Sequence, residues 1–168
     1  GTAVEWPLGL GGRGNDGVAS LVSLVPGAIG YLEYTYALQR LDRISFGIVQ
    51  NSAGNYVVPD AASFQAAASS ADWKAEKDFH LVLTNAPGED AYPITATTFA
   101  LMPKAPKSSE RSAAAIDCLR WLLENGRSQA ETLNYVPLPP ALIDQIEHYW
   151  RESVGAAPTV SASAKVKR

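Results

Sequence analysis

Residues 9–32, GLGGRGNDGVASLVSLVPGAIGYL, decide the fold class of this chain. Asn15 follows a glycine-dense loop and is a typical helix N-cap residue, and Asp16 in the first turn faces the positive end of the helix dipole. Apolar residues then recur at helical spacing until a Pro-Gly pair ends the pattern. The stretch therefore predicts a helix over residues 15–25, and the short apolar run at residues 28–32 predicts a strand that is buried on both faces.

The rest of the chain interleaves strand-like and helix-like segments. Strands are predicted at residues 3–6, 44–50, 56–58, 78–83 and 94–102, a short helix or turn at residues 33–40, and helices after the cap residue Asp60 and at residues 109–125 and 139–152. A Gly-containing loop joins residues 44–50 to residues 56–58 as a hairpin, so we expect a mixed sheet. The interleaving of strands and helices predicts the α/β class.

The last two predicted helices carry clear apolar stripes. In the first, Ile116, Leu119 and Leu123 share one face, and Gly126 is the expected C′ residue. Cys118 lies off the main stripe and is expected to pack as a small hydrophobe. The second helix begins after a Pro-Pro pair and carries a similar stripe.

Composition limits the classes of function. The chain has 168 residues, of which 46% are hydrophobic and 18% charged, so it can build a core. A net charge of −3 gives no basic field, and we therefore expect no nucleic-acid binding. The four tryptophans lie in separate segments, which favours separate packing anchors over a stacking platform for bases. They are Trp6, Trp73, Trp121 and Trp150.

The usual signatures of catalysis and metal binding do not occur in the sequence. Cys118 is the single cysteine, and His80 and His148 have no ligand spacing between them, so we predict no metal site. The adjacent carboxylates Glu89 and Asp90 point to opposite faces of an extended segment and make a poor acid–base pair. No phosphate-cradling loop and no nucleophile elbow occurs. We therefore predict that the protein is not an enzyme and uses no cofactor.

One glycine pattern leaves an alternative open. Gly9, Gly11 and Gly14 match the G-x-G-x-x-G pattern of dinucleotide-binding folds, and Glu33 lies where a ribose-binding acid would be needed. The alternative function is therefore a nucleotide-dependent oxidoreductase that uses the Gly9–Gly14 loop. Against it, Asp16 places a carboxylate at the helix N-terminus where a pyrophosphate would bind.

Five segments, in their order along the chain, resemble the high-affinity phosphate-binding proteins of bacterial phosphate importers, the PstS family. They are Trp6-Pro7 with residues 11–18 (GGRGNDGV), then residues 26–34 (PGAIGYLEY), 71–73 (ADW), 92–95 (YPIT) and 133–139 (LNYVPLP). Arg13 stands where the family usually has Lys or Arg. The resemblance implies a type II periplasmic binding protein-like α/β fold, with two lobes joined by a hinge, of which this chain is a part.

The resemblance also implies a function and a location. Such a protein binds inorganic phosphate outside the cytoplasmic membrane, in the periplasm or as a secreted protein, and delivers it to the membrane permease of an ABC importer. An adhesin or a moonlighting relative with the same receptor fold is a third possibility. Residues 1–90 would complete the second lobe, residues 91–154 would return to the first lobe, and residues 155–168 would form a flexible tail.

The resemblance places the main phosphate ligands in an N-terminal half that this chain lacks. In the family these are a Ser-Gly-Thr turn at a helix N-terminus, an Arg and an Asp, and no segment here corresponds to them. The N–H groups at the N-terminus of a helix bind anions. We therefore expect three residues near the anion as outer contacts, namely Arg13 and, through their backbone N–H groups, Gly14 and Asn15.

Overall fold

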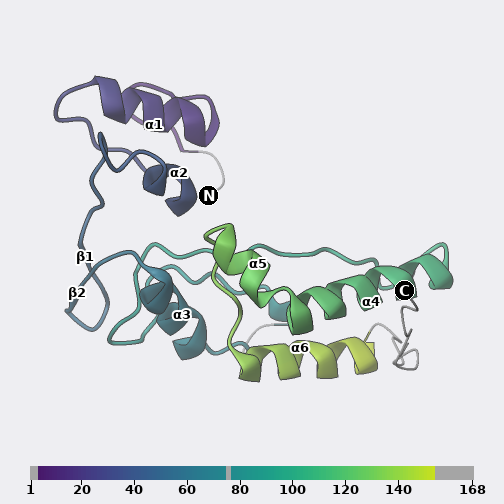
Figure 1. Ribbon diagram of the computed structural model, residues 1–168. Coiled ribbons are helices and arrows are strands. Elements are labelled where there is room, and N and C mark those ends of the chain that lie inside the picture. Colours follow the sequence, from purple (N-terminus) through teal and green to yellow (C-terminus); the bar gives the residue numbers. More distant parts are fainter. Residues whose placement is uncertain (1–3, 75–76, 154–168) are drawn as a thin grey trace, which may run out of the picture. The chain divides into compact units, whose positions relative to one another are not determined.

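The computed structural model describes residues 4–74 and 77–153. The chain divides into two compact units, Gly1–Ile48 and Val49–Arg168. In Figure 1 the first unit holds the two purple-to-blue helices α1 and α2, and the second holds the remaining elements. The predicted tail at residues 155–168 lies outside the described residues.

The first unit is built from α1 (Gly14–Leu24) and α2 (Tyr34–Leu38), which contact each other. Its buried side chains are small or medium in size: Ala19, Ala37 and Ile44. Gly30 lies directly on α1, because a Cβ at this position would come within 2.7 Å of Val22 Cγ2. Both helices confirm the predictions, although α1 begins one residue before the expected position.

The predicted strand at residues 28–32 is wrong. The segment lies outside any helix or strand, and its Ile29 side chain is 99% exposed rather than buried on both faces. An extended segment becomes a strand only when its N–H and C=O groups pair with a neighbour. No described segment pairs with residues 28–32, and the same holds for residues 4–6 of the strand predicted at 3–6.

The second unit begins with the predicted hairpin. Strand β1 (Val49–Gln50) pairs antiparallel with β2 (Tyr56–Val57), with Val49 opposite Val57. Helix α3 (Ala61–Ser70) follows, capped by Asp60, whose carboxylate accepts from the Ser63 N–H at 2.8 Å in a reciprocal capping box. The hairpin and the Asp60 cap are confirmed, but the paired part of the hairpin is shorter than expected.

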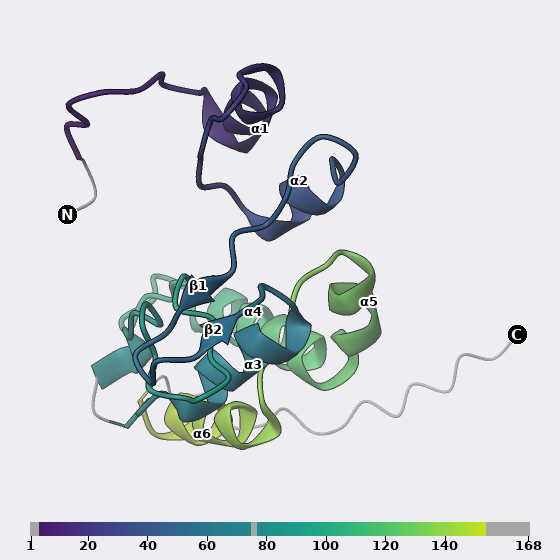
Figure 2. The same ribbon diagram turned by 90° about the vertical axis from the view of Figure 1, so that its left-hand side faces the viewer.

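The regular elements in the rest of the second unit are helices, joined by long irregular segments (Figures 1 and 2). They are the short 3₁₀ helix η1 (Lys77–Phe79), α4 (Ser109–Asn125), α5 (Arg127–Thr132) and α6 (Pro140–Ser153). The predictions for α4 and α6 are confirmed, whereas α5 was missed because its six residues carry no apolar stripe. Gly126 ends α4 but has a φ of −86°, so it does not adopt the left-handed C′ conformation that we expected.

The other two predicted strands are also wrong. Residues 78–83 form part of η1 and then an irregular segment, and residues 94–102 run without a partner strand. Asp78 and Phe79 take positive φ angles of 60° and 57°, which no strand residue adopts. Among the described residues the sheet therefore consists of β1 and β2. The larger mixed sheet that we expected for an α/β protein is not confirmed.

The largest apolar cluster of the second unit joins α3 to α6. Ala68, Trp73, Leu83 and Leu142 are buried together, and the indole N–H of Trp73 donates to the Ala68 carbonyl at 2.7 Å. Trp73 is thus the packing anchor that the sequence predicted. Trp6 and Trp121 are not, because 67% and 57% of their surfaces are exposed.

A buried asparagine fastens the hairpin loop to the segment that follows α3. The Asn51 amide donates to the carbonyl oxygens of Gly88, Glu89 and Ala91 at 3.3, 2.7 and 3.1 Å. Its side-chain oxygen accepts from the N–H groups of Ala53 and Asn55 at 3.1 and 3.0 Å. One side chain, whose two amide hydrogens are shared among three carbonyl oxygens, therefore contacts five backbone groups from two separate segments.

Candidate functional site

The N-terminus of α1 holds the three residues expected near an anion. Arg13 is the N-cap residue, with an extended backbone and no side-chain capping bond, and helix α1 starts at Gly14. Gly14 has a φ of +67°, a conformation that favours glycine. The first N–H groups of a helix have no acceptor within the helix, so those of Gly14 and Asn15 are chemically suited to an anion.

Asn15 is not the cap residue, contrary to the sequence prediction. Its side-chain oxygen accepts from the Glu33 N–H at 3.0 Å, and its amide donates to the Glu33 carboxylate at 3.4 Å. Glu33 is itself the N-cap residue of α2, so Asn15 ties the starts of the two helices together. Only the backbone N–H of Asn15 is left for an anion.

Charges around this helix start are partly compensated. Asp16 pairs with Arg40 at 3.1 Å, and Arg40 also donates to the Tyr36 carbonyl at 3.4 Å. Arg13 is exposed and makes no ion pair with a residue that the structure describes. The guanidinium of Arg13 is therefore the available positive charge at the start of α1.

The glycine loop is shaped by packing. A Cβ on Gly12 would come within 2.5 Å of the Val18 backbone nitrogen, so this glycine allows the loop to lie against α1. Glu33 is occupied by Asn15, and no described strand precedes the loop. A dinucleotide fold needs a strand before this loop and a free acid for the ribose. Nothing in this geometry favours the oxidoreductase alternative.

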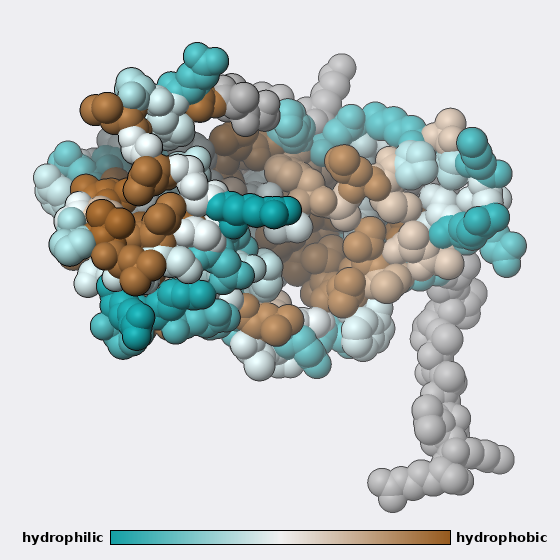
Figure 3. Space-filling model, turned by 90° about the horizontal axis from the view of Figure 1, so that it is seen from above, coloured by the Kyte–Doolittle hydropathy of each residue, from teal (hydrophilic) through white to brown (hydrophobic). Residues whose placement is uncertain are grey.

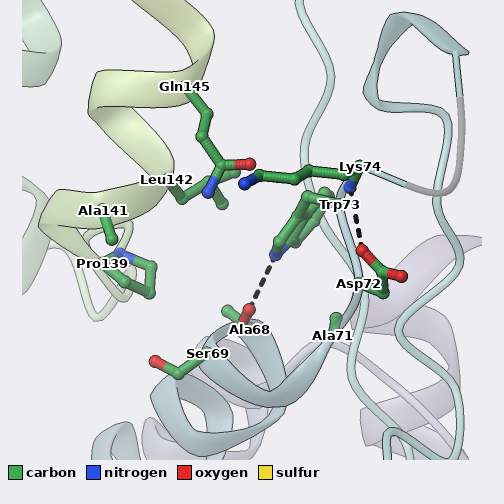
Figure 4. Close-up of a pocket in the computed structure, with 10 residues that line it drawn as sticks. All are labelled: Ala68, Ser69, Ala71, Asp72, Trp73, Lys74, Pro139, Ala141, Leu142 and Gln145. Atoms are coloured by element: carbon green, nitrogen blue, oxygen red, sulfur yellow. Dashed lines mark hydrogen bonds between the residues drawn. The ribbon is translucent and has the colours of Figure 1, made fainter.

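A small surface pocket in the second unit lies between the end of α3 and the start of α6 (Figure 4). Trp73 and Leu142 contribute apolar walls, and Lys74 and Gln145 point toward one another across it. Its volume is about 130 Å³, below the roughly 300–1,000 Å³ of typical ligand pockets. We assign no function to it.

A surface cluster joins η1 to α6 and to the segment before α4. The Tyr149 hydroxyl donates to the Asp78 carboxylate, and Lys104 Nζ lies 3.0 Å from the same carboxylate. The hydrogen bond to Asp78 is the main cause that raises the pKa of Tyr149, and the bond from Lys104 to Asp78 likewise raises the Lys104 pKa. The cluster is a structural tie, since its groups already satisfy one another.

Other sequence candidates remain dispersed. His80 and His148 are both exposed, and His148 pairs with Glu152 at 3.3 Å. Within residues 4–74 and 77–153, no three His, Cys, Asp or Glu side chains gather as metal ligands would. Cys118 is exposed, so its expected packing is wrong. No helix among the described residues combines the length and apolar content that a membrane crossing requires.

Comparison with known proteins gives close relatives for most of the chain. A phosphate-binding protein PstS of Xylella fastidiosa is 56% identical over 150 residues, which is 89% of this chain and 41% of the relative. The corresponding protein of Pasteurella multocida is 40% identical over 92% of this chain and 44% of its own length. That of Methanocaldococcus jannaschii is 30% identical over 83% of this chain. No family model matches.

These relatives confirm the resemblance that the five segments indicated. The chain is homologous to a part of proteins named Phosphate-binding protein PstS. It spans about two-fifths of the length of the curated relatives that it matches.

Proposed function

We propose that this chain is part of a receptor that binds inorganic phosphate outside the cytoplasmic membrane and delivers it to the permease of an ABC importer. The observation that carries the proposal is the 56% identity with a phosphate-binding protein over 89% of the chain. Such a receptor makes and breaks no covalent bond. It acts in the periplasm or as a secreted protein, and it requires no cofactor.

The rest of the protein is expected to supply the main phosphate donors. This chain matches 41% of the relative's length, and the family resemblance places those donors in the N-terminal half. A dehydrated oxyanion is held by hydrogen bonds from backbone N–H groups and hydroxyls, and closure of two lobes around it excludes water. We propose that residues 1–90 complete one lobe and residues 91–154 return to the other.

Within this chain, Arg13, Gly14 and Asn15 are proposed as outer contacts of the anion. The guanidinium of Arg13, which makes no ion pair within residues 4–74 and 77–153, and the first N–H groups of α1 support this role. The ion pair between Asp16 and Arg40 supports it too, because it neutralises the carboxylate in the first turn. Each such contact contributes about 0.3–1 kcal/mol at an exposed helix terminus.

The function is tested by calorimetry on the full-length protein with phosphate and, as a control, with sulfate. We expect micromolar or tighter binding of phosphate. A full-length protein that releases no heat with phosphate, under conditions where it is folded, would contradict the proposal.

The site is tested by the Arg13→Ala variant. We expect phosphate affinity to fall about two- to fivefold, the equivalent of roughly 0.3–1 kcal/mol. Arg43→Ala is the matched control, because Arg43 is an exposed arginine of the same unit whose partner is its neighbour Asp42, 3.4 Å away. Equal affinity in both variants would remove Arg13 from the site without affecting the proposed function.

A further inference from the structure

Helix α4 is apolar on two opposite sides. Its inner side is led by Ile116, which is 1% exposed, with Leu119 and Leu123 partly buried beside it. Its outer side carries Ala114, Cys118, Trp121 and Leu122, and all four are exposed. We call these four residues the outer face of α4. At 100° per residue they lie within one arc centred opposite Ile116, which also holds the exposed Arg111 and Asn125 near the two ends of the helix.

Helix α6 of the same unit differs from α4, because its solvent-facing side is polar. Its inner side is led by Leu142, which is 3% exposed, and its outer side carries charged and polar residues. His148 Nε2 lies 3.3 Å from the Glu152 carboxylate there, and Arg151 forms an ion pair with Glu147 at 3.9 Å. A surface helix normally has such a polar outer side, whereas a helix that is apolar all round is buried.

The apolar outer face contains two large exposed side chains. Trp121 and Leu122 are 57% and 49% exposed, and a tryptophan can bury about 150–250 Å² in a core or an interface. The view in Figure 3 shows apolar side chains gathered over the second unit as well. In that unit residues 94–102 are extended without a partner strand, and Leu101 is 92% exposed. The exposed apolar face of α4 and the unpaired segment 94–102 are both typical of a structure that lacks neighbouring elements.

We infer that the outer face of α4 is buried in the complete protein by the part of the same polypeptide that lies outside this chain. The inference rests on the proposal that the chain is part of a longer phosphate receptor. The relatives are more than twice as long as the matched segment, since the chain covers 41% of the first and 44% of another. The additional polypeptide is thus sufficient to cover one helix face.

Other occupants fit less well. A stable interface between separate chains needs about 800 Å² from each partner, more than one helix face of four side chains offers. A contact within one polypeptide has no such requirement for area, so it fits a face of this size.

Cys118 provides the test, because it lies in the middle of the outer face and is the single cysteine of this chain. The full-length protein is prepared with any cysteines outside this chain replaced by serine. Its thiol is then titrated with Ellman's reagent, in the native state and in guanidinium chloride. We expect the native thiol to react at least about a hundredfold more slowly, because reaction requires local opening.

The matched control moves the thiol to the outer side of α6. Asp144 is exposed there, so the double variant Cys118→Ser, Asp144→Cys should react in the native state within about threefold of the denatured rate. Native Cys118 reacting as fast as this control would overturn the inference. Protection that disappears on dilution would indicate a second copy, and protection that needs permease-containing vesicles would indicate the permease. Either result also overturns it.

Failure of the inference and failure of the proposed function are distinguishable in one preparation. A protein that binds phosphate but has a reactive Cys118 keeps the function and refutes the buried face. A protein with a protected Cys118 that binds no phosphate keeps the buried face and refutes the function.

Discussion

Replacement of Asn51 by alanine is expected to destabilise the protein by about 2–4 kcal/mol. Asn51 is 6% exposed, and its side chain bonds five backbone groups of two segments. A typical hydrogen bond contributes about 0.5–1.5 kcal/mol net, and a buried group left without a partner costs about 1–3 kcal/mol. The bond to the Ala91 carbonyl is in buried surroundings, whereas water can reach some of the other groups after the change. The estimate is therefore well below the cost of leaving five buried groups without a partner.

The assay is urea unfolding of the full-length protein, with the free energy of unfolding compared between variants. Asn55→Ala is the matched control, because Asn55 is exposed and its side chain donates one hydrogen bond, to the Glu89 carbonyl at 3.0 Å. It should cost less than about 1 kcal/mol. A loss below about 0.5 kcal/mol for Asn51→Ala would refute the reasoning.

Asn51→Asp separates the two halves of the network. The aspartate keeps an oxygen that accepts from the N–H groups of Ala53 and Asn55, but it replaces the amide donor by a carboxylate that faces three carbonyl oxygens. We expect it to be at least as destabilising as alanine at neutral pH. The loss in free energy of unfolding relative to the unchanged protein should become smaller as the pH falls through the pKa of the introduced carboxyl group, because the protonated acid can donate one hydrogen bond.

Three other changes are predicted to have measurable effects on the same free energy of unfolding. Leu142→Ala should cost about 2–4 kcal/mol, since it leaves a cavity beside Trp73 in the cluster that joins α3 to α6. Gly12→Ala should cost about 1–3 kcal/mol, because its Cβ would lie 2.5 Å from the Val18 nitrogen. Gly11→Ala is the control and should stay within about 0.5 kcal/mol, because its Cβ would have no atom within 4 Å. Equal losses of stability in the two variants would contradict the close approach of Gly12 to α1. The raised pKa of Tyr149 means that its hydrogen bond to Asp78 stabilises the fold below pH 10 and is lost as pH rises through the folded-state pKa. Tyr149→Phe should therefore reduce the loss of stability on raising the pH above 10, and an undiminished loss in this variant would contradict the role of the hydrogen bond.

The candidate site was only partly predictable. The presence of α1 and its approximate start follow from the glycine loop and the apolar spacing, which are local signals, but the N-cap residue is Arg13 and not the predicted Asn15. That the Asn15 side chain bonds Glu33, 18 residues away, depends on α1 meeting α2 and has no sequence signal. The Asn51 network has none either, because its partners lie 37 to 40 residues further along the chain.

The sequence by itself determined the longer helices and the resemblance to phosphate-binding proteins. Helices α1, α4 and α6 close their hydrogen bonds within one segment, so apolar period, caps and proline placement suffice to predict them. Residues 28–32 and 94–102 have strand-like composition, but a strand needs a partner for its backbone groups, and no described segment pairs with them. Burial of a side chain also depends on tertiary neighbours. Trp73 and Trp121 are the same residue type, but tertiary folding brings neighbours that bury Trp73 and leaves Trp121 57% exposed.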